Sequence, residues 1–233
     1  MDKAIVLVSG GVNSAVAAAV SREQYEVHLL HVAWGHRAAE REKACFEQLA
    51  GQLRIERKLV VDMAWLASCG GNSRGSRRLP MEDVSALGSE TPSTFVLGLV
   101  PVMLGAAAAW AGSLGAKRII IGTSEDHHVP GPAISQLYPD YRREFVQTFN
   151  LMLEYGKSPR RELLVEAPFA ELNRREVVLL GRRLKVPFEK TWSCYRNADE
   201  PCAKCLACAT RAAGFLRAGI PDPLMLEPAG KEA

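Results

Sequence analysis

Four cysteines near the C-terminus have the spacing of a metal site. Cys194, Cys202, Cys205 and Cys208 follow one another as C-x7-C-x2-C-x2-C. Four converging thiolates match the tetrahedral coordination of a structural zinc ion and leave no position open for water. The sequence therefore predicts a zinc site that folds the end of the chain. The alternative, four unligated thiols on a helix, is disfavoured by this spacing.

A glycine turn near the N-terminus has the residues of an anion site. Ser9-Gly10-Gly11-Val12-Asn13-Ser14 follows an apolar run and precedes an alanine-rich stretch. Glycines let the backbone approach a ligand closely, and N–H groups at a helix start can point at a phosphate. The stretch lacks the lysine of a Walker A loop and does not match G-x-G-x-x-G. A tight turn that uses glycine for geometry alone is an equally good interpretation.

Alternating strands and helices are predicted to position these residues. Buried strands are predicted at 5–9, 27–34, 57–62, 118–123 and 163–167. Helices are predicted at 13–24, 38–53, 95–114, 141–155, 174–184 and 206–218, with Asn173 as a helix N-cap. The alternation indicates an α/β protein whose parallel sheet has helices on both faces. A Gly/Ser/Arg-rich stretch at 68–93 predicts a mobile loop, and 124–139 predicts a polar one.

Composition is that of a globular protein with reduced thiols. Of the 233 residues, 48% are hydrophobic and 24% charged, and a net charge of +3 is too small to indicate nucleic-acid binding. Met1-Asp2-Lys3 leads into an apolar run too short for a signal peptide, so we expect a cytoplasmic protein. Residues 95–111 carry no charge, but Pro101 favours a buried helix over a membrane span. Cys45 and Cys69 are predicted to be plain thiols.

Several stretches resemble the 7-cyano-7-deazaguanine synthases, a family of the PP-loop ATP pyrophosphatase superfamily. The glycine turn is similar to the superfamily's SGGxDS pyrophosphate loop. The family's motif YGQRH-x-x-E is matched by Trp34-Gly35-His36-Arg37 with Glu40, and its motif YPDCRPEF by Tyr138-Pro139-Asp140-Tyr141-Arg142-Arg143-Glu144-Phe145. Its motif TWSCY is matched by Thr191-Trp192-Ser193-Cys194-Tyr195. Its cysteine tail is matched by Cys202, Cys205 and Cys208, followed by Arg211, Phe215, Gly219 and Asp222-Pro223. The resemblance spans nearly the whole chain. It implies a Rossmann-like nucleotide-binding domain of the adenine nucleotide alpha-hydrolase type over 1–190, with a four-cysteine zinc-binding region over 191–233 packed on it.

The resemblance implies an ATP-dependent carbon–nitrogen ligase. The family converts 7-carboxy-7-deazaguanine to 7-cyano-7-deazaguanine with ATP and ammonia, a step of queuosine biosynthesis. The implied mechanism first adenylates the carboxylate, because a carboxylate oxygen is a poor leaving group and AMP a good one. Ammonia then gives an amide, which a second activation dehydrates. The implied cofactors are ATP, Mg²⁺ and Zn²⁺, and the implied assembly is a homodimer.

The same resemblance assigns site residues. Adenine is expected against the ends of the first two strands, and the glycine turn is expected to hold the pyrophosphate. The implied nucleotide-binding residues are Val8, Ser9, Gly10, Gly11, Val12, Asn13, Ser14, His31, Trp34, Gly122 and Thr123. Catalytic work is expected of Ser9, Asn13, Ser14 and Arg174, although Arg174 equally fits a solvated arginine on a basic helix start.

Four polar residues are expected to contact the substrate: Arg37, Asp140, Arg143 and Glu144. The last three also fit the first turn of a helix, where an acidic side chain is favoured by the helix dipole. His127-His128 resembles a metal or general-base pair, but adjacent residues in a proline-rich loop usually point apart.

Departures from the family pattern predict a divergent member. Asn13 stands where the superfamily has aspartate, which removes a charge expected to help position Mg²⁺. Leu99 and Val100 replace the arginine and asparagine of the family's VPGRN stretch, and Tyr141 replaces a cysteine. A guanidinium lost from a phosphate or purine site is a bidentate donor that leucine cannot replace.

Three hypotheses follow from the match and its departures. The first is a ligase that makes the nitrile, or stops at the amide, with ammonia. The second is an enzyme that joins the activated deazaguanine to an amine of a protein or nucleic-acid partner, as in a defence system. The third is a catalytically degenerate protein that keeps the fold and binds the nucleotide.

Overall fold

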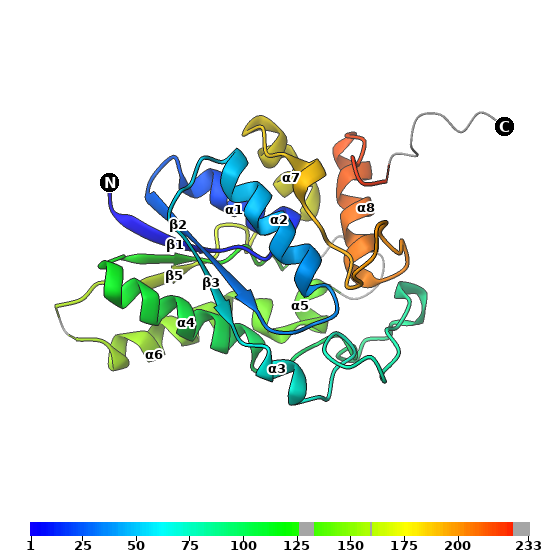
Figure 1. Ribbon diagram of the computed structural model, residues 1–233, viewed down its shortest axis with the longest axis horizontal. Coiled ribbons are helices and arrows are strands. Elements are labelled where there is room, and N and C mark those ends of the chain that lie inside the picture. Colours follow the sequence, from blue (N-terminus) through cyan, green and yellow to red (C-terminus); the bar gives the residue numbers. More distant parts are fainter. Residues whose placement is uncertain (126–132, 159, 226–233) are drawn as a thin grey trace.

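The computed structural model describes residues 1–125, 133–158 and 160–225, so the His127-His128 pair lies outside the described residues. Five strands form one sheet in the order β3-β2-β1-β4-β5 (Figure 1). They are β1 (Lys3–Leu7), β2 (Glu26–Ala33), β3 (Lys58–Asp62), β4 (Arg118–Ile120) and β5 (Leu164–Glu166), and every neighbouring pair is parallel. The predicted α/β class and parallel sheet are confirmed.

This strand order is that of a doubly wound, Rossmann-like sheet. The chain builds outward from β1 through β2 to β3, then returns to add β4 and β5 on the other side of β1. The strand order therefore reverses between β1 and β4. Open α/β sheets bind their ligands in the crevice at this switch point, beyond the carboxyl ends of the strands.

Helices cover both faces of the sheet (Figure 1). One face carries α1 (Val12–Ser21), α2 (Ala39–Gln52) and α7 (Arg174–Arg183), with α8 (Leu206–Ala218) packed beside α7. The other carries α4 (Leu99–Leu114) and α6 (Arg143–Gly156). The shorter helices are α3 (Trp65–Ser68), η1 (Val84–Ala86), α5 (Ile134–Leu137), η2 (Pro139–Tyr141) and η3 (Phe188–Lys190).

The central place of β1 in the sheet explains why its sequence is a continuous apolar run. Ala4 and Val6 belong to the core on the α1 side, whereas Ile5 and Leu7 belong to the core on the α4 side. Successive side chains of a strand point to opposite faces, so a strand buried on both faces must be apolar at every position. Burying each large aliphatic side chain stabilises the fold by about 1.5–3 kcal/mol.

The uncharged segment 95–111 forms most of helix α4. Leu104, Ala107 and Ala111 are fully buried against the sheet, and Gly115 ends the helix in a left-handed conformation. Within the described ranges, no helix has the length and apolar character needed to cross a membrane. The predicted helix is present, but the expectation that it is fully buried is wrong, because only the face that packs on the sheet is buried and Gly105, Ala109 and Ser113 are exposed.

The start of α7 is fixed by the predicted N-cap. The Asn173 side chain accepts a hydrogen bond from the Glu176 backbone N–H at 3.1 Å, and a Glu176 carboxylate oxygen accepts one from the Asn173 N–H at 2.8 Å. This reciprocal capping box satisfies two backbone donors at the helix start. It also fixes where Arg174, the first residue of α7, leaves the backbone.

The segment 68–93 is held at several points, although its composition predicts a mobile loop. The Ser73 N–H donates to the Ser93 carbonyl at 2.8 Å, and their hydroxyls lie 2.9 Å apart. The Val84 N–H donates to the Lys204 carbonyl at 2.8 Å, which links the segment to the cysteine-rich tail. These bonds fix the backbone on both sides of Arg74.

The C-terminal tail is pinned to the body by a buried ion pair. Arg211 bonds both carboxylate oxygens of Asp222 at 2.8 Å, and also donates to the Thr191 hydroxyl at 2.8 Å. Phe215 packs edge-to-face on Phe188 and joins the core on the α1 side. The region 191–225 therefore shares a core with the α/β body.

Candidate functional site

A cavity of about 260 Å³ lies at the switch point of the sheet. Its walls come from the glycine turn, the ends of β1 and β2, the residues after β4, the starts of α4 and α7, and the tail. The polar residues in its lining are Ser9, Asn13, Ser14, His31, Glu42, Arg74, Thr123, Tyr138, Tyr141, Arg174, Ser193, Tyr195, Thr210 and Arg211. Of the predicted nucleotide-binding residues, all except Gly10 contribute to the lining.

Gly10 makes the turn possible without lining the cavity. Its φ of +85° is left-handed, and a Cβ there would lie 2.7 Å from the carbonyl oxygen of Glu42. Only glycine fits such a position without strain. The Gly10 carbonyl accepts a hydrogen bond from the Trp192 backbone N–H at 2.9 Å. The glycine turn and the cysteine-rich tail, far apart in sequence, therefore meet at the cavity.

Asn13 joins two other parts of the site. Its amide Nδ2 donates to the Gly122 carbonyl at 3.0 Å, and its Oδ1 accepts from the Arg174 guanidinium. A Cβ on Gly122 would lie 3.0 Å from the Asn13 carbonyl, so a side chain there would push the glycine turn away from the end of β4. An aspartate could accept from Arg174 but could not donate to Gly122. Arg174 lies in the cavity wall and is partly exposed, and its catalytic role stays a prediction.

The two serines of the turn lie side by side. The hydroxyl of Ser14 donates to the Gly11 carbonyl at 3.0 Å and lies 3.3 Å from the Ser9 hydroxyl. Gly11 is the N-cap of α1. Hydroxyls next to a helix start form the kind of site where a phosphate is favoured, because unsatisfied N–H groups and the positive end of the helix dipole meet there.

His31 presents a buried acceptor to the cavity. Its Nδ1 lies 2.8 Å from the Val8 carbonyl, so Nδ1 must carry the proton. Burial lowers the pKa of His31, which keeps the ring neutral at physiological pH. Nε2 is then an acceptor, and it has no hydrogen-bond partner in the part of the chain that the structure describes. The ring is held by stacking on Phe46, with centroids 5.2 Å apart.

An arginine that sequence reasoning missed lies between two aromatic rings of the cavity. The guanidinium carbon of Arg74 is 5.1 Å from the ring centroid of Trp34 and 5.0 Å from that of Tyr195. Only 14% of its side chain is exposed. Trp34 belongs to the Trp-Gly-His-Arg stretch and Tyr195 to the tail, but Arg74 comes from the 68–93 segment. No periodicity or motif marks it there.

A carboxylate that sequence reasoning also missed stabilises the charge of Arg74. Glu42, from α2, lies 3.9 Å from an Arg74 guanidinium nitrogen and 3.0 Å from His36 Nε2. Burial opposes the charge of Arg74, but Glu42 outweighs it and raises the pKa of Arg74. Burial likewise opposes the charge of Glu42, but His36 and Arg74 lower the pKa of Glu42. The result is a charged network at the wall of the cavity.

None of the four residues predicted to contact the substrate lines the cavity. The Arg37 guanidinium instead donates to the backbone carbonyls of Ser76 and Leu79, so it anchors the 68–93 segment. Arg143 is half-exposed and pairs with Glu171 at 2.9 Å, and Glu144 is exposed in the first turn of α6. Their role as substrate contacts stays a prediction, and the lining does not support it.

Asp140 is the buried member of that set. The residue is 8% exposed, and its buried Oδ1 has no hydrogen-bond partner among the described residues. Burial raises the pKa of Asp140 to about 6, with Arg74 acting in the opposite direction. Its neighbours Tyr138 and Tyr141 line the cavity, and the Tyr138 hydroxyl lies 3.0 Å from that of Tyr195. Asp140 is thus buried next to the cavity wall without lining the cavity.

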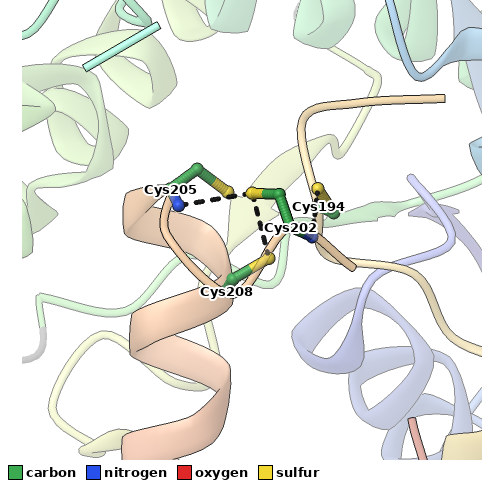
Figure 2. Close-up of side chains that lie close together, drawn as sticks. All are labelled: Cys194, Cys202, Cys205 and Cys208. Atoms are coloured by element: carbon green, nitrogen blue, oxygen red, sulfur yellow. Dashed lines mark hydrogen bonds between the residues drawn. The ribbon is translucent and has the colours of Figure 1, made fainter. Parts of the chain in front are cut away.

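The four tail cysteines converge as predicted. Figure 2 shows the side chains of Cys194, Cys202, Cys205 and Cys208 with their sulfur atoms turned toward one another at the start of α8. All four sulfurs lie within 4.8 Å of one another, and those of Cys202 and Cys208 are 3.9 Å apart. Tetrahedral zinc with about 2.3 Å bonds requires sulfurs about 3.8 Å apart. The cysteines are free thiols, so the geometry fits a metal ion.

Backbone donors around the sulfurs favour thiolates. Cys194 Sγ accepts from the N–H groups of Cys202 at 3.4 Å and Arg196 at 3.5 Å, and Cys202 Sγ accepts from the Cys205 N–H at 3.4 Å. Hydrogen bonds from the thiols of Cys205 and Cys208 lower the pKa of Cys194, and the same bonds raise the pKa of Cys205 and of Cys208, so Cys194 is the sulfur most readily deprotonated before a metal binds. Zinc requires such deprotonated sulfur. The donor set therefore fits the predicted zinc.

The cysteine cluster shapes the cavity without entering it. Ser193 and Tyr195, on either side of Cys194, line the cavity, as do Leu206 and Ala207 between Cys205 and Cys208. A metal held by four thiolates has no open coordination position. A metal bound there would fix these lining residues in place.

The predicted Mg²⁺ is matched less well by the cavity. Mg²⁺ is held in proteins by carboxylates together with substrate phosphates and water. Among the described lining residues Glu42 is the one carboxylate, and it is engaged by His36 and Arg74. Asn13 is committed to Gly122 and Arg174. We therefore assign no protein ligand to Mg²⁺.

The chain matches one protein family over nearly its full length. The family described as "Queuosine biosynthesis protein QueC" matches residues 3–219. A 7-cyano-7-deazaguanine synthase of Chloroherpeton thalassium is 34% identical over 223 residues, covering 95% of this chain and 96% of the relative. The enzymes of the same name from Chlorobium phaeobacteroides strain BS1 and Campylobacter curvus are each 35% identical, covering 97% and 96% of this chain and 97% of each relative.

Solved structures resemble the chain more distantly. A predicted subunit of tRNA methyltransferase from Methanocaldococcus jannaschii is 13% identical with a TM-score of 0.44, covering 98% of this chain and 94% of that one. An NH3-dependent NAD synthetase from Campylobacter jejuni is 11% identical with a TM-score of 0.43, covering 80% of this chain and 65% of that one.

Proposed function

The chain belongs to the QueC family of queuosine biosynthesis proteins, and from this premise we propose that it is an ATP-dependent ligase acting on 7-carboxy-7-deazaguanine or a close analogue. In this proposal the enzyme adenylates the carboxylate and passes the activated group to ammonia. The observation that carries the proposal is the meeting of the glycine turn and the cysteine-rich tail around one cavity, joined by the Trp192-to-Gly10 hydrogen bond.

The first step forms an acyl adenylate. A carboxylate oxygen attacks the α-phosphorus of ATP, and the bond to pyrophosphate breaks. Negative charge that builds on the leaving pyrophosphate needs preorganised donors. The Ser9 hydroxyl and the N–H groups that open α1 supply neutral donors, and Arg174 supplies positive charge. The Ser14 hydroxyl becomes a further donor when it turns from the Gly11 carbonyl to the phosphate. The bridge through Asn13 keeps Arg174 aimed at this position.

The adenine is expected at the ends of β1 and β2. Val8 and Val32 give this part of the cavity an apolar wall. The buried His31 Nε2 is an acceptor in need of a donor, and the amino group of adenine is a donor of the right chemistry. His31 would therefore favour adenine over guanine, whose carbonyl oxygen would face another acceptor.

The next steps make the amide and then the nitrile. Ammonia attacks the acyl carbon, AMP leaves with the carboxyl oxygen, and a proton is released to give the amide. A second ATP adenylates the amide oxygen, and loss of AMP and a proton leaves the nitrile. Water would destroy either adenylate. Leu99 and Val100 make that part of the wall apolar where the family has polar residues, which helps to exclude water.

Zinc in this proposal is structural and holds the tail side of the cavity. Mg²⁺, if used, would enter on the phosphates of ATP, because the cavity offers it no uncommitted carboxylate among the described residues. The predicted homodimer and a protein partner stay predictions.

The test is AMP release with and without 7-carboxy-7-deazaguanine. Purified protein is incubated with ATP, Mg²⁺ and isotopically labelled ammonia, and the products are identified by mass spectrometry. We expect acid-dependent AMP and pyrophosphate, and a nitrile or amide that contains the labelled nitrogen. Acid-dependent AMP without a labelled product would instead favour transfer to an amine of a protein or nucleic acid. Absence of AMP would contradict the proposal and favour a degenerate nucleotide-binding protein.

A further inference from the structure

The cavity holds a second cation whose surroundings differ from those of Arg174. Arg174 lies beside the glycine turn and contacts Asn13. Arg74 instead lies over the rings of Trp34 and Tyr195, next to Glu42. The proposed chemistry needs positive charge at the pyrophosphate, and Arg174 meets that need. The proposed activation step assigns no role to Arg74.

The hydrogen-bonding groups of Arg74 are incompletely used within the protein. Its Nε is buried and has no hydrogen-bond partner among the described residues. The nearest Glu42 oxygen is 3.9 Å from an Nη, beyond hydrogen-bonding distance, because Glu42 sits closer to His36 at 3.0 Å. A guanidinium presents five N–H donors in a planar fork that matches a carboxylate. A buried donor without a partner is costly, so these groups favour an incoming acceptor.

Arg74 is also held in place before any ligand binds. Its backbone carbonyl accepts from the Arg37 N–H at 2.9 Å, and the adjacent Ser73 is bonded to Ser93. The rings of Trp34 and Tyr195 restrict where the guanidinium can move, and Trp34 is itself fully buried and stacked on His36 at 4.4 Å. A donor that is already oriented loses little conformational entropy on binding.

Arg74 supplies the cavity with a guanidinium, whereas Leu99 stands where the family has an arginine. Leu99 and Val100, which stand where the family has arginine and asparagine, line the same cavity as Arg74. We propose that Arg74 is the specificity-determining residue that binds the carboxylate of the acid to be activated, and this inference rests on the proposed function. The 68–93 segment, rather than the start of α4, then selects the substrate.

Two ligands of nearly the same shape should respond differently to the loss of the Arg74 charge. 7-Carboxy-7-deazaguanine carries a negative charge that pairs with Arg74, whereas the corresponding amide is neutral. Hydrogen bonds to a charged group contribute about two to three times as much as neutral ones. Removing the Arg74 charge should therefore weaken binding of the acid far more than binding of the amide. A residue that only supports the fold would affect the two ligands equally.

The experiment measures binding of the acid and the amide by isothermal titration calorimetry, with a non-hydrolysable ATP analogue present. Arg74→Met and Arg74→Gln are compared with wild type. We expect the acid to bind about 10- to 100-fold more weakly to either variant, and the amide to change by less than about fivefold. Arg41→Met is the matched control, because Arg41 lies 4.7 Å over the Trp192 ring but outside the cavity lining.

Each outcome is decisive. An equal loss of acid and amide binding, or no loss, overturns the role of Arg74 while leaving the proposed function standing. Failure of wild type to bind either ligand overturns the proposed function together with the role of Arg74. If Arg74→Met does not fold, as judged by circular dichroism, Arg74→Gln decides the matter, because glutamine retains an N–H donor toward Glu42 while removing the charge.

Discussion

Asn13 is the residue on which three parts of the site depend. It reaches the Gly122 carbonyl with its amide nitrogen and the Arg174 guanidinium with its amide oxygen. The asparagine amide is therefore a structural bridge in this chain, and it makes a hydrogen bond to Gly122 that an aspartate could not make. The bridge ties the glycine turn to the end of β4 and to the start of α7.

Asn13→Ala should loosen this bridge. Loss of two hydrogen bonds is expected to lower the free energy of unfolding by about 1–2 kcal/mol. AMP formation should fall at least about 10-fold, because Arg174 loses a partner that aims it at the pyrophosphate. Urea unfolding and AMP release measure the two effects. Wild-type stability and AMP formation in the alanine variant would show that the bridge does not organise the site.

Asn13→Asp is the informative comparison for that variant. The carboxylate keeps an acceptor for Arg174 but places an oxygen against the Gly122 carbonyl. We expect stability to fall while AMP formation is largely retained. AMP formation that appears only in the aspartate variant would instead identify the natural protein as degenerate.

Asp140 predicts a pH-dependent difference in stability. Its pKa is raised by burial from 3.8 to about 6. The favourable contribution of its protonated carboxyl is complete below pH 3.8 and is lost as the pH rises through about 6. Asp140→Asn removes this titration. The free energy of unfolding of the variant, relative to wild type, should therefore rise between about pH 4 and pH 7 by about 2–3 kcal/mol. A difference that does not change with pH would contradict the assignment.

At the scale of elements, the cysteine cluster should govern the tail. Cys208→Ser removes one ligand and should abolish tight zinc binding, which wild type is expected to show at one ion per chain. The melting temperature should fall by roughly 10 °C, because a structural metal contributes several kcal/mol. Metal analysis and thermal melting report both. Cys69→Ser is the control, since Cys69 is exposed and lies outside the cluster. Equal zinc content in the two variants would exclude the cluster as the metal site.

The Arg211–Asp222 pair should be a second attachment of the tail. Arg211→Met leaves the Asp222 carboxylate buried without its partner, which should cost about 3–5 kcal/mol. Arg143→Met removes an exposed pair with Glu171 and should cost less than about 1 kcal/mol. Urea denaturation distinguishes the two. Similar losses for the two variants would show that burial does not determine the strength of the Arg211 pair.

Elements with a local signal could be predicted from the sequence. The apolar run of β1, the Asn173 cap and the bounds of α8 are each set by residues close together in the chain. The cysteine spacing likewise predicted which four thiols converge. The orientation of α6 had no such signal. Arg143 and Glu144 share a motif with Tyr138 and Tyr141, yet only the tyrosines face the cavity.

For the whole molecule, the site could be predicted only where the fold class dictates it. A parallel sheet brings the ends of β1 and β4 together, so the glycine turn and residues 122–123 were expected to be neighbours. Arg74 and Glu42 could not be found, because they meet through contacts between the 68–93 segment, α2 and the tail. Charges placed by tertiary contacts leave no pattern in one sequence, whereas buried strands do.

The central claim is that one cavity holds the phosphates of ATP at the glycine turn and the acid at Arg74. The most direct test is a crystal structure with a non-hydrolysable ATP analogue and 7-carboxy-7-deazaguanine. We predict phosphate density within hydrogen-bonding distance of Ser9, Ser14 and Arg174, and the carboxylate against the Arg74 guanidinium. A nucleotide bound away from residues 9–14, or an acid whose carboxylate lies away from Arg74, would contradict the account.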